Sequence, residues 1–169
     1  MDRPSKELSE AYDKLLAADA EARKWIETAK HPRWKRPFTD LAYKPMLEVL
    51  QYLRANGYRT YIVTGGGQDF VRVYSERVYG IPPEQVVGTM GGTSYRYDKD
   101  GKPILTKDPK LLLNDNDAGK PEGIHLMIGR RPVAAFGNSP GDQQMLEYTG
   151  ADFIHPILTR PLLPPAADP

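Results

Sequence analysis

Tyr-Arg-Thr-Tyr-Ile-Val-Thr-Gly-Gly-Gly occupies residues 58–67 and has the pattern of a buried strand that ends in a glycine turn. The apolar part predicts a strand over 58–63. Segments with helical spacing flank it on both sides: one over 45–56, stopped by Gly57, and one over 68–79, stopped by Gly80. Helices that alternate with strands are typical of a parallel α/β sheet.

The rest of the middle of the chain continues this pattern. An Asp-Gly pair between strand-like flanks predicts a hairpin around residues 95–105. The other expected elements are a short strand at 85–87, a helix at 120–128, a strand at 132–136, a turn at 137–140 and a helix at 141–148.

Both ends of the chain differ from this α/β segment. Residues 5–30 have the spacing of one or two amphipathic helices, and a basic, aromatic and proline-broken connector follows at 31–38. Five prolines fall in the last twenty residues, where no further strand and helix are expected. We therefore divide the chain into residues 1–36, 37–149 and 150–169.

Composition excludes several classes of protein. The 169 residues carry 23 Lys and Arg against 22 Asp and Glu, and this balance argues against nucleic acid or an anionic membrane as a partner. No cysteine is present, which excludes disulfides, a thiolate nucleophile and cysteine-ligated metals. No signal-like apolar segment and no run of about 20 apolar residues is found, so the expected location is the cytoplasm.

Two strand-end turns carry groups suited to ligand chemistry, because ligands of open α/β sheets bind beyond the carboxyl ends of the strands. Thr64 with Gly65 and Gly66 offers a hydroxyl and unhindered amides, which suit a phosphoryl group. A simple glycine turn explains this segment equally well. In the second turn, Asn138 and Asp142 offer oxygen ligands of the kind Mg²⁺ accepts, although an ordinary turn followed by a first-turn carboxylate is the alternative.

Three further features have competing interpretations. Residues 137–141 match the G-x-S-x-G nucleophile elbow around Ser139, with Asp152 and His155 downstream, but the chain has no later strands to present that acid and base. Lys120 is either a surface lysine or a point charge for a phosphate. Asp115 and Asp117 are either a carboxylate metal pair or polar turn residues, and we favour the turn.

The ordered set of these motifs resembles the haloacid dehalogenase-like (HAD) hydrolase superfamily. A strand-end Thr with glycines, a helix-start Lys and a strand-end Gly-Asn-Ser-x-Gly-Asp correspond to its second, third and fourth motifs. The closer likeness is to the phosphoserine-phosphatase-like branch. The resemblance covers residues 31–149.

This resemblance implies an α/β fold with a Rossmann-like parallel sheet, here incomplete, and a helical cap, of which residues 1–36 would be a remnant and connector. It implies hydrolysis of phosphate monoesters with Mg²⁺, and a small phosphorylated substrate or inorganic phosphate as partner. Thr64, Lys120 and Asp142 would be catalytic, and they would converge at one edge of the sheet. The implied phosphate ligands are Thr64, Gly65, Gly66 and Lys120, and the implied metal ligands are Asp142 and Asn138.

The first motif of the superfamily, an Asp-x-Asp after a central strand, has no counterpart before Thr64. We therefore expect a truncated and catalytically impaired phosphatase-like protein, whose unpaired strand edges favour self-association. A non-catalytic phosphate-binding or interaction module is the second hypothesis. A serine hydrolase that uses Ser139 is the third.

Overall fold

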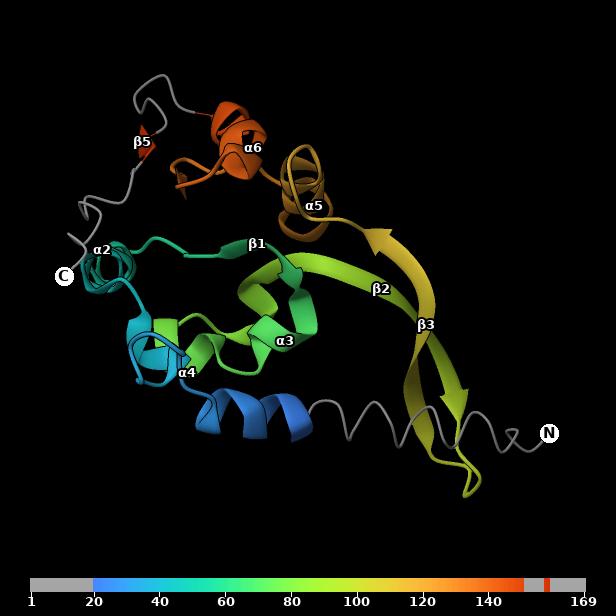
Figure 1. Cartoon of the computed structure of the whole chain (residues 1–169). Helices are drawn as coiled ribbons and strands as arrows, with labels where there is room; N and C mark the ends of the chain where they lie inside the picture. The colour runs from blue at the N-terminus through green and yellow to red at the C-terminus, as the bar shows by residue number, and fades with distance from the viewer. Residues whose placement is uncertain (1–19, 151–156, 159–169) are drawn as a thin grey trace.

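The structure, a computed structural model, describes residues 20–150 and 157–158 (Figure 1). Residues 20–28 are helical. The labelled elements follow in the order η1 (Phe38–Leu41), α2 (Lys44–Ala55), β1 (Ile62–Gly67), α3 (Gln68–Arg72), α4 (Ser75–Tyr79), η2 (Pro83–Gln85), β2 (Val86–Tyr97), β3 (Pro103–Leu113), α5 (Gly119–Ile128), β4 (Phe136–Gly137), η3 (Pro140–Asp142), α6 (Gln143–Tyr148) and β5 (Ile157–Leu158).

The strands form two separate sheets. The larger has the order β1-β2-β3, with β1 parallel to the first part of β2, and β2 antiparallel to β3. The smaller pairs β4 with β5 in parallel. The predicted α/β class is confirmed, with a sheet that is mixed rather than wholly parallel.

The β2-β3 hairpin is confirmed and is longer than expected, because β2 continues from the parallel pairing with β1 into the antiparallel pairing with β3. Its turn is held by Asp98, whose Oδ1 accepts the backbone N–H groups of Asp100 and Lys102. Gly101 has φ +78, a value that favours glycine. The hairpin extends away from the rest of the molecule in Figure 1.

The helices follow the sequence pattern with two exceptions. α2 and α5 begin one residue earlier than expected, and each ends before a glycine of positive φ. The helix expected at 68–79 is instead two short helices, α3 and α4, separated by a turn at residues 73–74. The helix expected at 141–148 is preceded by the 3₁₀ turn η3, and its α-helical part is α6.

Three predictions about strands were wrong in their bounds. The strand expected at 58–63 begins at Ile62, because pairing with β2 begins there, and it continues through the glycines to Gly67. The strand expected at 132–136 is reduced to β4, which has a strand partner for only two residues. The tail, expected to contain no strand, contributes β5. The bounds of β1 and β4 are therefore set by the residues that pair with a neighbouring strand.

Helices cover both sides of β1. Figure 1 shows α5 and α6 on one side and α3 and α4 on the other. The core on the α5 side is built by Ile124, Met145 and Leu146, against which the partly buried Val63 of β1 packs. This core fixes α5 between β1 and α6, and with it the first turn of α5.

The N-terminal helical residues pack through aromatic side chains. Trp25 stacks on Phe38, with ring centroids 5.3 Å apart, and also contacts Phe70 of α3. The connector returns on itself through a β-bridge between Lys30 and Pro37. None of the described helices is long and apolar enough to cross a membrane.

One edge of β1 pairs with no strand of the described part of the chain. Within residues 20–150 and 157–158, β1 has β2 as its strand partner and β4 has β5, and the two do not pair with each other. The sequence analysis expected unpaired strand edges, and the described residues show β1 with such an edge.

Candidate functional site

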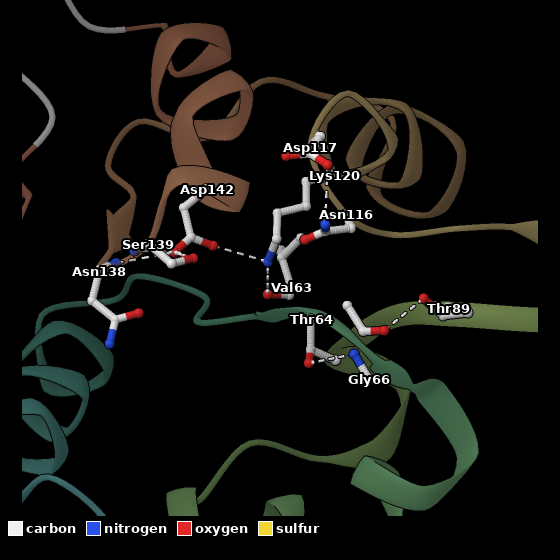
Figure 2. Close-up of polar contacts among 11 residues, drawn as sticks. Val63, Thr64, Gly66, Thr89, Asn116, Asp117, Lys120, Asn138, Ser139 and Asp142 are labelled. Atoms are coloured by element: carbon white, nitrogen blue, oxygen red, sulfur yellow. Dashed lines mark hydrogen bonds and ion pairs between the residues drawn. The ribbon is translucent and has the colours of Figure 1, made fainter.

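The centre of the site is the buried ammonium of Lys120, in the first turn of α5. Its side chain is 6% exposed. Its Nζ donates a hydrogen bond to the Val63 carbonyl oxygen at 2.8 Å and lies 3.1 Å from Asp142 Oδ1 (Figure 2). Lys120 therefore joins β1 to the turn that follows β4.

Asp142 is held as a carboxylate by groups around it. Its Oδ2 accepts the backbone N–H groups of Asn138 and Ser139, each at 3.0 Å, and the Ser139 hydroxyl at 3.1 Å. Burial raises the pKa of Asp142, but the hydrogen bonds from Lys120 and the two N–H groups outweigh that effect and lower the pKa below its usual range. A Cβ atom at Gly137 would lie 2.5 Å from Asp142 Cβ, so the close approach requires glycine.

The Thr64 hydroxyl is directed away from Lys120. Thr64 Oγ1 accepts the Gly66 N–H at 3.1 Å, and Figure 2 shows its side chain on the other side of β1 from the ammonium. The Gly65 carbonyl accepts a hydrogen bond from Thr89 Oγ1 at 2.8 Å. The structure therefore brings Lys120 and Asp142 together. Thr64 follows Val63, the residue whose carbonyl binds Lys120, and its own hydroxyl is bonded to the Gly66 N–H.

The loop before α5 crosses between the two strand-end turns. Thr89 Oγ1 accepts the Asp115 N–H at 3.1 Å and so links the loop to Gly65. Asn116 Oδ1 lies 3.4 Å from where a Cβ atom of Gly65 would be and 2.6 Å from that of Gly141. Asn116 is thus a residue of the site that the sequence interpretation missed.

Asp115, which the sequence analysis interpreted as a polar turn residue, is fully buried. Neither of its carboxylate oxygens has a hydrogen-bond partner among the described residues. Burial raises its pKa to about 6. The nearby Lys120 ammonium, and the Thr64 N–H, which approaches the carboxyl without reaching hydrogen-bond geometry, offset only part of that rise. A Cβ atom at Gly123 would come within 2.6 Å of Asp115 Oδ1, so the carboxyl occupies space that only a glycine leaves open.

Comparison with known proteins decides the family. A profile described as haloacid dehalogenase-like hydrolase matches residues 2–147. The chain belongs to the HAD-like hydrolase family. No curated protein sequence matches it.

One solved structure similar to this HAD-like chain is described as a conserved functionally unknown protein from Anaerococcus prevotii DSM 20548. The two share 26% sequence identity with a TM-score of 0.47. The match covers 66% of this chain and 28% of the other, so this chain spans less than a third of that protein.

The HAD-like family generally uses Mg²⁺, but the described residues do not by themselves form a site for it. No group of three or more His, Cys, Asp or Glu side chains converges among them. The Asp142 carboxylate is already engaged by Lys120 and by three donors of the β4 turn. The metal-binding roles of Asp142 and Asn138 therefore stay predictions from the family resemblance.

The paired interpretation of Asp115 and Asp117 is not supported by their positions. Asp115 is fully buried, whereas Asp117 is exposed and its Oδ2 accepts a hydrogen bond from Asn116 Nδ2 at 3.0 Å. Asp117 has φ +51, a conformation that Asp tolerates in turns. The turn interpretation holds for Asp117 alone.

Ser139 makes its hydrogen bonds within its own turn, to Asp142. It forms a capping box with Asp142, in which the Ser139 hydroxyl oxygen accepts the Asp142 N–H and the Asp142 carboxylate accepts the Ser139 N–H. Asp152 and His155, the proposed acid and base of a serine hydrolase, lie outside the described residues.

Changing Asp115 to Asn is expected to stabilise the protein. The folded-state pKa of about 6 lies above the ordinary value of 3.8, so folding favours the protonated carboxyl and the ionised form lowers stability. The Asn variant should gain up to about 3 kcal/mol near pH 8, roughly half of that near pH 5, and nothing below the ordinary pKa. Urea unfolding across this pH range measures the gain.

The Asp117→Asn variant is the control for removal of a nearby exposed carboxylate. Equal stabilities of the wild type and Asp115→Asn near pH 8 would contradict the burial argument.

Proposed function

We propose that this chain is the phosphate-binding part of a phosphate-monoester hydrolase of the phosphoserine-phosphatase type. The observation that carries the proposal is the buried Lys120 ammonium, which lies between the Val63 carbonyl of β1 and the Asp142 carboxylate in the turn after β4. A buried cation beside strand ends neutralises the charge of a bound phosphoryl group, because the low dielectric of the interior strengthens the attraction.

The Thr64 turn supplies the other proposed ligands. Gly65 and Gly66 follow Thr64 without side chains, and unhindered amides and a hydroxyl suit phosphate oxygens. In the free protein the Thr64 hydroxyl accepts the Gly66 N–H. Phosphate binding would therefore require this local hydrogen bond to break and the Thr64 hydroxyl, which lies on the other side of β1 from Lys120, to turn toward the ligand.

Turnover is expected to be at or near background. Covalent phosphoryl transfer needs a nucleophile, and in the described part of the chain no aspartate follows a strand before Thr64. Positioning and charge stabilisation would remain without the bond-forming step. A non-catalytic phosphate-binding or interaction module is the alternative, and it shares the same site.

The test is binding of inorganic phosphate followed by amide chemical shifts. We expect shifts at Gly65 and Gly66, and a loss of affinity of about tenfold in Thr64→Val, because one hydrogen bond to a charged ligand is worth about 1.5 kcal/mol or more. Thr93→Val, at an exposed position of β2, is the matched control.

Two results would change the proposal. Absence of phosphate-dependent shifts at both glycines rejects the phosphate site. Robust Mg²⁺-dependent hydrolysis of a generic phosphate monoester by the highly purified chain would reveal a nucleophile and exclude the non-catalytic alternative.

A further inference from the structure

The Asp115 carboxyl is fixed beside the proposed phosphate site. The Asp115 N–H donates a hydrogen bond to Thr89 Oγ1, and this hydroxyl donates to the Gly65 carbonyl. The carboxyl is fully buried over Gly123, with no hydrogen-bond partner for either oxygen among the described residues. Such an unsatisfied buried group is costly, and its persistence points to a role with a ligand.

Two carboxylates flank one ammonium at this place. Asp142 is engaged at both oxygens, including the ion pair with Lys120. Asp115 lies near enough to the same cation to feel its charge, and it has no such set of donors. With both carboxylates ionised, the buried cluster carries a net charge of about −1 before any anion arrives.

A bound dianion would make this charge more negative in a place of low dielectric, which is strongly unfavourable. A proton relieves the excess, and Asp115 is the group that can accept it, since hydrogen bonds hold Asp142 ionised. Of the elements packed around Asp115, α5 contributes the charged Lys120. Strands β1, β2 and β3 contribute the uncharged Thr64, Val87, Thr89 and Leu113.

We infer that Asp115 takes up one proton from solvent when a phosphate-type dianion binds beside Lys120, so that oxyanion binding and protonation are coupled. The inference rests on the proposed function, because it concerns the same site. Asp115 is a positioning residue in this scheme: it sets the charge around Lys120. No covalent bond other than the carboxyl O–H forms in this step.

The resting state of Asp115 suits this coupling. Burial raises the pKa of its carboxyl to about 6, so near pH 7 about a tenth of the molecules already carry the proton. Protonation on ligand binding is then accessible at neutral pH. An exposed carboxyl of ordinary pKa would offer far fewer protonated molecules.

Calorimetric titration of the full chain with sulfate tests the inference. Sulfate is the probe because it stays a dianion across the neutral range, whereas phosphate itself titrates there. Binding heats are measured near pH 7 in two buffers of different ionisation enthalpy, which gives the number of protons exchanged. We expect uptake close to one proton per sulfate, and an affinity that falls about tenfold per pH unit above pH 6.

The Asp115→Asn variant carries a neutral group of the same shape. It should bind sulfate with no proton uptake, with an affinity that does not change over this pH range, and at least as tightly as the wild type near pH 8. Asp117→Asn should keep the proton uptake. The number of protons taken up by the wild type is measured without any variant, so the test remains valid even if Asp115→Asn folds poorly.

The outcomes separate the two claims. Sulfate binding by the wild type without proton uptake, or unchanged uptake in Asp115→Asn, overturns the inference and leaves the proposed phosphate site standing. Absence of sulfate binding by the wild type and by Asp115→Asn at every pH overturns both.

Discussion

Replacing Lys120 with Met is expected to lower the free energy of unfolding by about 3–5 kcal/mol, because breaking a buried ion pair leaves an uncompensated buried charge. Lys120 and Asp142 side chains are 6% and 12% exposed, and Lys120 also satisfies the Val63 carbonyl. The variant leaves both flanking carboxylates, Asp142 and Asp115, without their cation. Urea unfolding near neutral pH measures the effect.

Two comparisons isolate the cause. Lys107→Met removes the lysine of a more exposed ion pair with Asp69 and should cost less than about 1 kcal/mol. Adding Asp142→Asn to Lys120→Met removes the orphaned charge and should recover part of the loss. A cost below about 1 kcal/mol for Lys120→Met would show that this ion pair is not a buried one in solution.

Replacing Gly119 with Ala is expected to cost about 3 kcal/mol or more. A Cβ atom there would lie 1.8 Å from the Asn114 carbonyl oxygen, a backbone atom that cannot rotate away. Overpacking typically costs about 1–3 kcal/mol, and a clash with backbone belongs at the upper end. Relief would require Asn114 to move, and the buried Asp115 follows it directly in the chain.

Gly67→Ala is the matched control. A Cβ atom at Gly67 would meet Phe70 at an ordinary 4.0 Å, and its φ of −59 suits any residue. Its effect on thermal stability should be within about 0.5 kcal/mol. If Gly119→Ala were as stable as Gly67→Ala, the loop before α5 would have to be far more adaptable than its contacts indicate.

Local patterns predicted the elements whose stability is local. α2 and α5 are marked by their stop glycines, and the β2-β3 hairpin by the Asp98 to Gly101 turn, so the sequence places all three well. The strands expected at 58–63 and 132–136 were misplaced because a strand ends where its partner ends, and partners are non-local.

The candidate site shows the same division. Lys120 and Asp142 stand at a helix start and a strand-end turn, so the topology alone predicts their meeting. Asp115 was taken for a turn residue because polar turn residues look alike in sequence. Only the space over Gly123 and the hydrogen bond to Thr89 decide which of them is buried. The Thr64 hydroxyl faces away from Lys120 because pleating alternates side chains along a strand.

Because the strands form two separate sheets, we expect two parts of the molecule to open independently. β4, η3 and α6 form one part, which packs on the other mainly through α5. Native-state hydrogen exchange reports such partial opening, and the amides of this part should exchange ahead of those of the β2-β3 hairpin. Lys120 bonds to both parts, through Val63 and Asp142. An anion that weakens the ion pair between Lys120 and Asp142 is therefore expected to make the smaller part open more often.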